Sequence, residues 1–216
     1  MALDFTNAPA NNAYFLPPAA DNRWRYNTTK TQWKSNRGWT LVQRGGAVNT
    51  DAPLIRFDLP AGFSHFEIRV RGFNCAVDYP NAVAYCALSI DNGATYLTPY
   101  AQTMLYSSTT LLTGYTNSNV VNVQAGTSSL KPGWPSNYTF RVFPGKAGVR
   151  RPTFYWNAAT FHHPSGGPLI SWGGGRCYTA VGTPVATNLA LFAIDAGTTR
   201  NVQHRGFSII GISRGP

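Results

Sequence analysis

The sequence predicts an all-β protein, an antiparallel β-sandwich or jelly roll, and three observations lead to that fold class. Only 12% of the 216 residues are charged, about half the usual share, whereas 21 are Gly and 15 are Pro. Glu occurs once, at Glu67, although helices favour Glu, Lys and Leu. Short runs of apolar, β-branched and aromatic residues recur between turn residues from position 53 onward.

The clearest strand is His65 to Arg71, in which Phe66, Ile68 and Val70 share one face and polar residues share the other. The other expected strands are 39–43, 54–59, 82–90, 120–123, 138–143, 153–161, 177–181, 188–194 and 207–212. About eight to ten short strands separated by turns are typical of an antiparallel sandwich. The run Gly173-Gly174-Gly175 predicts a bulge or a tight bend at a corner of that sandwich.

The octapeptide Ser89 to Tyr96 predicts a tight hairpin. Its centre, Asp91-Asn92-Gly93, suits a two-residue type I′ turn, because Asn and Gly tolerate the positive φ that both central positions need. Asp91 is expected to accept hydrogen bonds from the backbone ahead of it. The pattern Ser-x-Asp-x-Gly-x-Thr-aromatic resembles the Asp-box hairpin of sialidases, secreted carbohydrate-active proteins and phage structural proteins. A single copy indicates a structural turn, with no catalytic role for Asp91.

The first 38 residues predict an extended, irregular N-terminal arm, and residues 39–216 predict the sandwich domain. Pro and Asn interrupt any periodicity in the arm, yet it carries large rings, as segments that dock on a neighbouring protein do. The candidate assembly contacts are Phe5, Tyr14, Phe15, Trp24, Tyr26 and Trp33. The alternative is a β-rich lead-in that folds onto the same domain.

No catalytic, cofactor-binding or metal-binding residue is expected. Most of the eight acidic residues lie in turns, which leaves no clear carboxylate pair for a glycosidase. The neighbours His162 and His163 would point to opposite faces of a strand and could not easily hold one ion. Cys75, Cys86 and Cys177 show no zinc spacing and are interpreted as buried thiols, although a bridge between Cys75 and Cys86 stays open.

The net charge of +10 comes mostly from arginines that, beyond the pairs Arg69/Arg71 and Arg150/Arg151, are spread singly along the chain. Assembly contacts or a solvated surface therefore explain them better than nucleic-acid binding, which would need them on one contiguous face. A basic surface would also suit an anionic polysaccharide. Loop aromatics can stack on sugars, and the candidate glycan contacts are Trp134, Trp156 and Trp172, with core or interface packing as the more common explanation.

Taken together, residues 50–216 resemble β-sandwich structural proteins of tailed bacteriophages. The resemblance is carried by Ile55 to Phe63, with its Leu-Pro-x-Gly-aromatic ending, and by Phe66 to Gly72 leading into Leu88 to Tyr96. The closing strand Gly206 to Ile212 completes the set. The resemblance implies a role in the particle, as a tail, fibre or receptor-binding component or as a head decoration. It implies no catalytic residue.

We therefore expect a non-enzymatic phage virion structural protein, tail- or fibre-associated or capsid-decorating, that assembles through its N-terminal arm. The alternative is a carbohydrate-binding or glycan-depolymerising receptor-binding protein. Expected partners are other virion proteins and further copies of the chain, a trimer being favoured, together with a host surface glycan; no cofactor is expected. Met1 to Phe5 lacks a signal peptide and no stretch approaches about 20 apolar residues, so we expect synthesis in the host cytoplasm, no membrane insertion, and a place in the virion.

Overall fold

A computed structural model describes residues 14–15, 24–27, 32–35, 38–79, 81–98, 100–106, 111–118, 120–123, 130–161, 168–177 and 185–213. In these residues every regular element is a strand, which confirms the predicted all-β class. The strands are β1 (Tyr14–Phe15), β2 (Trp24–Asn27), β3 (Gln32–Ser35), β4 (Trp39–Gly45), β5 (Val48–Ala52), β6 (Leu54–Asp58), β7 (His65–Cys75), β8 (Val83–Ser89), β9 (Tyr100–Tyr106), β10 (Leu111–Ser118), β11 (Val121–Asn122), β12 (Ser136–Phe143), β13 (Thr153–Phe161), β14 (Pro168–Cys177), β15 (Asn188–Asp195), β16 (Thr198–Arg200), β17 (Val202–His204) and β18 (Gly206–Ile212).

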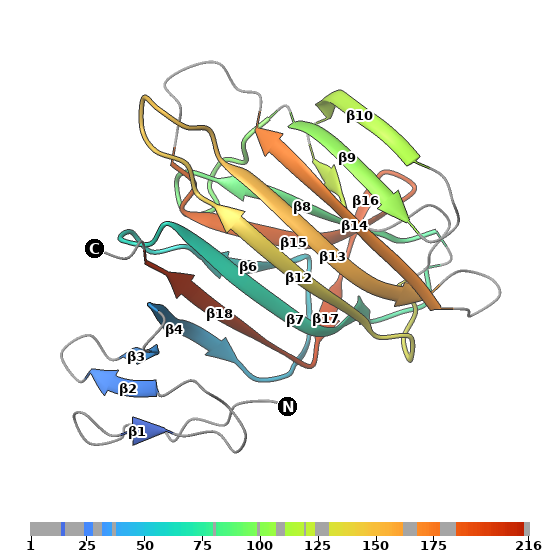
Figure 1. The fold of residues 1–216 in the computed structure, drawn as a ribbon. Helices are drawn as coiled ribbons and strands as arrows, with labels where there is room; N and C mark the ends of the chain where they lie inside the picture. Colours follow the sequence, from blue (N-terminus) through green and yellow to red (C-terminus); the bar gives the residue numbers. More distant parts are fainter. Residues whose placement is uncertain are drawn as a thin grey trace.

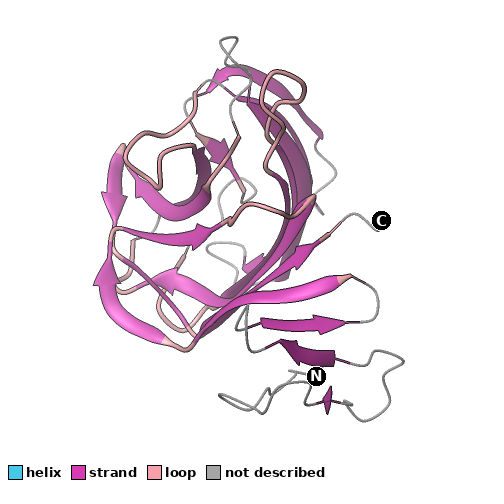
Figure 2. Ribbon diagram, turned by 90° about the vertical axis from the view of Figure 1, so that its left-hand side faces the viewer, coloured by secondary structure: helices cyan, strands magenta, loops and turns pink. Residues whose placement is uncertain are grey.

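The strands form two antiparallel sheets. The large sheet has the order β1-β2-β3-β4-β18-β7-β12-β13-β14-β9-β10, with β17 pairing with β7 and β5. The second sheet has the order β11-β8-β15, and the far side of β15 pairs with β6 and β16. Figure 1 shows the second sheet behind the large one, and Figure 2 shows the large sheet curving along one side of it. The arrangement is sandwich-like, and the jelly-roll order in particular stays a prediction.

The core lies between the two sheets because alternate residues of their strands point toward each other. The predicted inner face of β7, Phe66, Ile68 and Val70, is at most 1% exposed. The core of the large sheet continues through Tyr138, Phe140, Val142, Phe154, Trp156 and Ile209, and the second sheet contributes Phe57, Cys86, Leu88, Leu189 and Leu191.

Two contacts join the sheets directly. The hydroxyl of Tyr100 in β9 lies 2.7 Å from the backbone nitrogen of Leu88 in β8, which donates to it. The rings of Phe57 in β6 and Phe207 in β18 meet edge to face with centroids 5.2 Å apart. Buried aromatic pairs of this kind add to the hydrophobic term, so they help fix how the two sheets sit on each other.

The structure describes three short strands in the N-terminal segment. Residues 14–15, 24–27 and 32–35 form three antiparallel strands that continue the large sheet beyond β4. Trp33 pairs with Leu41 and Lys34 with Thr40, so the sheet crosses the boundary drawn at residue 38. This pairing supports the alternative of a β-rich lead-in over an irregular arm. Phe5 lies outside the described residues, as do His162 and His163.

The structure corrects the prediction for the glycine run. Gly173, Gly174 and Gly175 lie inside β14 in regular register with β13, so they form neither a bend nor a corner. The missing side chains make room for rings of β13: a Cβ on Gly173 would lie 2.5 Å from the Trp156 ring, and one on Gly175 would lie 2.8 Å from the Phe154 ring. Aromatic residues that cover glycines of a neighbouring strand are a known device for stabilising sheets.

The Asp91-Asn92-Gly93 turn has the predicted conformation but not the predicted length. Asn92 has φ 57° and Gly93 has φ 89°. The backbone nitrogen of Ala94 donates to the carbonyl of Asp91 over 3.4 Å around Asn92 and Gly93, but the turn does not run directly into a second strand, because the next strand pairing is an isolated bridge between Ser89 and Tyr96. The connection therefore holds six residues rather than two.

Candidate functional site

The outer face of the large sheet, directed away from the second sheet, is the most distinctive surface of the described residues. Cross-strand register places its side chains in rows across β7, β12, β13 and β14. One row reads Glu67, Arg141, Tyr155, Gly174, and the next reads Arg69, Thr139, Asn157, Trp172. We call this surface the arginine–aromatic face; it comprises His65, Glu67, Arg69, Arg71, Thr139, Arg141, Phe143, Tyr155, Asn157, Ile170, Trp172 and Arg176.

This face brings Arg141 and Arg176 together with the nearby pair Arg69 and Arg71 of β7. Arg69, Arg71, Arg141 and Arg176 are all exposed on it, while Glu67 is the one acidic residue of its rows. Arg69 and Arg71 are close together in the sequence, and the fold adds Arg141 and Arg176, which were expected to be scattered, to the same face. Such a face creates a positive potential that attracts anionic partners.

Glu67 sits at the centre of an arginine pair. The Nε of Arg69 donates to the Oε1 of Glu67 over 2.7 Å, and the Nη2 of Arg141 lies 3.8 Å from the other carboxylate oxygen. The Glu67 side chain is 13% exposed, whereas those of Arg69 and Arg141 are 55% and 57% exposed. Arg69 thus holds the carboxylate closely, and Arg141 keeps most of its hydrogen-bonding capacity for other partners.

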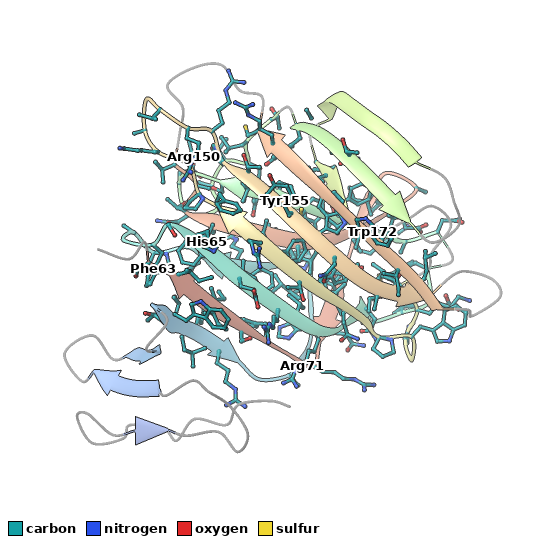
Figure 3. The ribbon with its side chains drawn as sticks, in the orientation of Figure 1. Phe63, His65, Arg71, Arg150, Tyr155 and Trp172 are labelled. Atoms are coloured by element: carbon teal, nitrogen blue, oxygen red, sulfur yellow. The ribbon has the colours of Figure 1, made fainter. Side chains whose placement is uncertain are left out.

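The aromatic part of the face begins with a ladder of three rings. His65 stacks on Phe143 with centroids 5.0 Å apart, and Phe143 meets Tyr155 edge to face at 6.0 Å. Tyr155 and Trp172 remain 54% and 45% exposed, which is unusual for large rings. Figure 3 shows both rings on the surface of the large sheet that faces the viewer, with His65 on the same face.

A shallow hollow of about 280 Å³ lies between these rings. Its lining includes Glu67, Thr139, Arg141, Tyr155, Asn157 and Trp172. The hollow therefore offers two aromatic walls, a hydroxyl, an amide, a carboxylate and a guanidinium. A second hollow of about 450 Å³ lies near the Asp91 turn, between Gln43, Asp58 and Asn92, and it combines no comparable set of groups.

The charges around the hollow affect the imidazole of His65. Its pKa is lowered mainly because burial penalises the charged ring, and Arg141 and Arg150 lower it further, while Glu67 acts in the opposite direction. The Oγ of Ser64 lies 2.9 Å from its Nδ1. His65 is therefore neutral at pH 7 and serves as a stacked ring rather than as a cation.

The outer face of the second sheet differs sharply from the arginine–aromatic face. Its central rows place Tyr85 beside Phe192, Val83 beside Ile194, and Ala87 beside Ala190. The rings of Tyr85 and Phe192 stack with centroids 6.2 Å apart, and Leu54 of β6 pairs with Phe192. We call the half-buried side chains Leu54, Val83, Tyr85, Phe192 and Ile194 the apolar face. The next row holds the buried Ala87 and Ala190 together with the exposed Arg56, which pairs with Ala190.

The turn around Asp91 is held by its own side chains. Ser89 donates to the Asp91 carboxylate over 2.7 Å and accepts from the backbone nitrogen of Gly93 over 2.9 Å, while the backbone nitrogen of Thr95 donates to the same carboxylate over 2.7 Å. The Ser89 hydroxyl, followed by the Thr95 backbone, lowers the pKa of Asp91. With the carboxylate occupied in this way, Asp91 acts as the support of a turn.

The three candidate glycan contacts lie in three different settings. Trp172 is exposed on the arginine–aromatic face, as glycan contact requires. Trp156 is 3% exposed and packs in the core, although it also contributes to the lining of the hollow, so its role as a glycan contact stays a prediction. Trp134 lies in the loop before β12, where the Lys131 ammonium sits 5.5 Å from its ring centroid. Tyr155, the residue before Trp156, is 54% exposed on the arginine–aromatic face and was not among the candidates. Adjacent residues of a strand point to opposite faces, so a buried Trp156 implies an exposed Tyr155.

The structure describes the backbone, but not the side chains, of most candidate assembly contacts in the N-terminal segment. Tyr14, Phe15, Trp24, Tyr26 and Trp33 lie in strands β1 to β3, whose side chains are outside the described part. Cys75, Cys86 and Cys177 are buried and form no disulfide, and burial, with a smaller contribution from Asp195, raises the pKa of Cys75 to about 12.

The described residues contain no group of three or more His, Cys, Asp or Glu side chains placed to hold a metal ion. Within the same part of the chain, no helix is long and apolar enough to span a bilayer. No family model, curated protein or solved structure matches this chain.

Proposed function

We propose that this chain is a non-enzymatic structural protein of a bacteriophage particle, tail- or fibre-associated or capsid-decorating, which displays its β-sandwich on the particle. The observation that carries the assembly role is the apolar face of the second sheet. A sheet face that points away from the core of a lone soluble domain is normally polar. The half-buried apolar side chains on this face, bordered by the exposed Arg56, support a contact with another protein there.

The two outer faces suggest how the sandwich is oriented. The apolar face has aromatic and branched aliphatic side chains and suits burial against a neighbouring subunit. The arginine–aromatic face carries four exposed arginines and suits contact with water and with an outside ligand. We therefore propose that the second sheet turns toward the particle and the large sheet turns outward.

The N-terminal segment has a place in the same proposal. Strands β1 to β3 lie at one end of the large sheet, beyond β4 (Figure 1). A chain that adds strands at a sheet edge leaves a further edge to which a neighbour can pair. Anchoring through residues 2–36 would use this edge and the aromatic residues that the segment contains.

The test is incorporation into particles of variants on the two faces. Phe192→Lys places a charge in the centre of the apolar face, and Ile170→Lys is its matched control, because Ile170 is an apolar residue on the arginine–aromatic face with 54% exposure. We expect Phe192→Lys to remain folded by circular dichroism and to be lost from purified particles, while Ile170→Lys is incorporated normally. Equal incorporation of both variants would contradict the proposed role of the apolar face.

Deletion of residues 2–36 tests the anchoring role separately. The core residues that the structure describes lie between positions 42 and 209, so we expect a soluble, folded domain that fails to join the particle. Normal assembly of the deletion variant would overturn the anchoring role and leave the apolar face as the contact.

A second candidate function, host-glycan recognition, is favoured by the exposed rings of Tyr155 and Trp172 beside the hollow. Binding sites for sugars need flat apolar surfaces flanked by polar groups that fix orientation. The depolymerase version has less support, since Glu67 is the one carboxylate of these rows and it is paired with Arg69.

A further inference from the structure

We propose that the arginine–aromatic face binds an acidic glycan, with one carboxylated sugar ring in the hollow between Tyr155 and Trp172 and its carboxylate on Arg141. This inference rests on the second candidate function, glycan recognition. It adds the chemical class of the ligand and the residue that selects it.

The dimensions of the hollow favour a single ring. Its volume of about 280 Å³ lies just below the roughly 300–1,000 Å³ typical of small-molecule pockets. Tyr155 and Trp172 come from neighbouring strands, and Gly174, which pairs with Tyr155, leaves the sheet between them without a side chain. A Cβ on Gly174 would lie 2.9 Å from the Tyr155 ring, so glycine lets that ring settle close to β14.

The polar lining of the hollow matches a ring that carries several hydroxyl groups. Glu67 accepts hydrogen bonds only, Thr139 can donate and accept, and Asn157 offers both a carbonyl and an amide. Thr139 and Asn157 pair directly across β12 and β13, so their side chains stand side by side on the floor. Sugar hydroxyls are both donors and acceptors, and these three residues can satisfy both.

Arg141 supplies the preference for an acidic sugar. Its guanidinium lies 3.8 Å from the Glu67 carboxylate, too far for a hydrogen bond, and its side chain is 57% exposed. A planar guanidinium can hold a carboxylate through two parallel hydrogen bonds. Arg69 already holds Glu67, so a ligand carboxylate on Arg141 would not have to compete with that closer contact.

The remaining arginines extend the site for a polymer. Arg176 pairs with Thr153, one row from Tyr155. Arg71 lies on the opposite side of the hollow, further along β7 than Glu67 and Arg69 (Figure 3). Neighbouring acidic units of a chain that crosses the sheet would meet these charges. A basic surface on both sides of a single-ring hollow therefore suits a repeating polyanion.

A single-stranded nucleic acid is the competing ligand, because it also combines rings with negative charge. Repulsion from Glu67 does not separate the two ligands, because a sugar carboxylate on Arg141 would also lie near Glu67. The polar lining of the hollow favours the sugar, since Glu67, Thr139 and Asn157 offer acceptors to hydroxyl donors, which sugars carry at most positions.

The experiment measures binding of the full-length protein to polygalacturonate, alginate, hyaluronate and polysialic acid, each paired with its carboxyl-reduced counterpart. We expect at least one acidic polymer to bind and its reduced form to bind at least about tenfold more weakly, as loss of a charged hydrogen-bond partner would produce. An oligothymidylate of similar charge is the nucleic-acid arm.

Variants then place the binding on the hollow. Arg141→Gln and Trp172→Ala should each weaken binding by about tenfold or more, while Arg56→Gln, which removes an exposed arginine of the second sheet, should change it less than twofold. Arg141→Gln should also reduce the difference between the acidic polymer and its reduced form, which a purely structural role of Arg141 would not do.

The outcomes separate this inference from the function on which it rests. Equal binding of an acidic polymer and its reduced form would overturn the acidic-glycan inference and keep glycan recognition. Binding of none of the glycans would overturn both, and binding of oligothymidylate alone would identify the face as a nucleic-acid surface instead. If an acidic polymer binds the wild type and binds Trp172→Ala equally tightly, the hollow is not the binding site.

Discussion

Replacing Gly173 by Ala tests the packing that places Tyr155 and Trp172 on one face and Trp156 in the core. A Cβ at position 173 would lie 2.4 Å from the backbone oxygen of Thr103 and 2.5 Å from the Trp156 ring. Side chains can rotate away from such a contact, but a backbone oxygen in a paired strand cannot move without disturbing the ladder between β14 and β9. Overpacking of this kind costs about 1–3 kcal/mol, and the upper part of that range applies here.

Part of this cost is offset, because Ala is favoured over Gly within a strand by roughly 0.5–1 kcal/mol. The net destabilisation should therefore be about 2 kcal/mol. For a chain of this length, each kcal/mol lowers the melting temperature by roughly 2–4 °C, so Gly173→Ala should melt about 4–8 °C below the wild type. Differential scanning calorimetry or thermal circular dichroism measures the difference directly.

The neighbouring residue provides the control. A Cβ on Gly174 would meet the exposed Tyr155 ring at 2.9 Å and no backbone atom closer than 3.5 Å. That ring can move outward, so Gly174→Ala should melt within about 2 °C of the wild type, near the range of an ordinary surface substitution. If the two variants melt together, or if Gly173→Ala matches the wild type, the assignment of inner and outer faces in β14 is wrong.

Four further predictions concern the turn, the histidine and the thiols. Ser89→Ala should lower the free energy of unfolding by about 1–3 kcal/mol in urea denaturation, because the buried backbone nitrogen of Gly93 loses its acceptor. The lowered pKa of Asp91 means that its carboxylate stabilises the fold above its unfolded-state pKa near 3.8 and that this stabilisation is lost as pH falls through the folded-state pKa. The stability difference between wild type and Asp91→Asn should therefore be constant above about pH 5 and shrink below about pH 4; a difference that persists at pH 2 would contradict the ionic role. Arg150→Gln should raise the pKa of His65 in an NMR titration, since the Arg150 charge lowers it, and an unchanged value would show that the two groups do not interact. Ellman's reagent should label the thiols only after denaturation, because Cys75, Cys86 and Cys177 are at most 1% exposed; rapid labelling of the native protein would show that one of them is accessible.

The alternation of single strands was enough to predict much of the fold. The strand His65 to Arg71 shows its buried and exposed sides in the sequence, and the structure places Phe66 and Arg69 accordingly. The same reasoning applied to β13 separates Trp156 from Tyr155, because adjacent strand residues point to opposite faces. Trp156 lies inside the expected strand 153–161, so this alternation, rather than a place in a loop, decides which of the two rings is exposed.

The candidate site could not be predicted in the same way, because it depends on pairing between distant segments. Arg141 reaches Glu67 only because β12 lies beside β7, and Trp172 reaches Asn157 only because β14 lies beside β13. Register between strands is set by packing across the whole sheet, which local propensity does not encode. The glycine run was misinterpreted for the same reason: Gly173 makes room for Trp156, a residue of another strand.

An image reconstruction of the particle that contains this chain is the most direct measurement of the proposed arrangement. We expect a neighbouring subunit to cover Leu54, Tyr85 and Phe192 of the apolar face and to leave Tyr155 and Trp172 open to solvent on the outside of the particle. Burial of the arginine–aromatic face with exposure of the apolar face would contradict the orientation, and a particle without this chain would contradict the virion role itself.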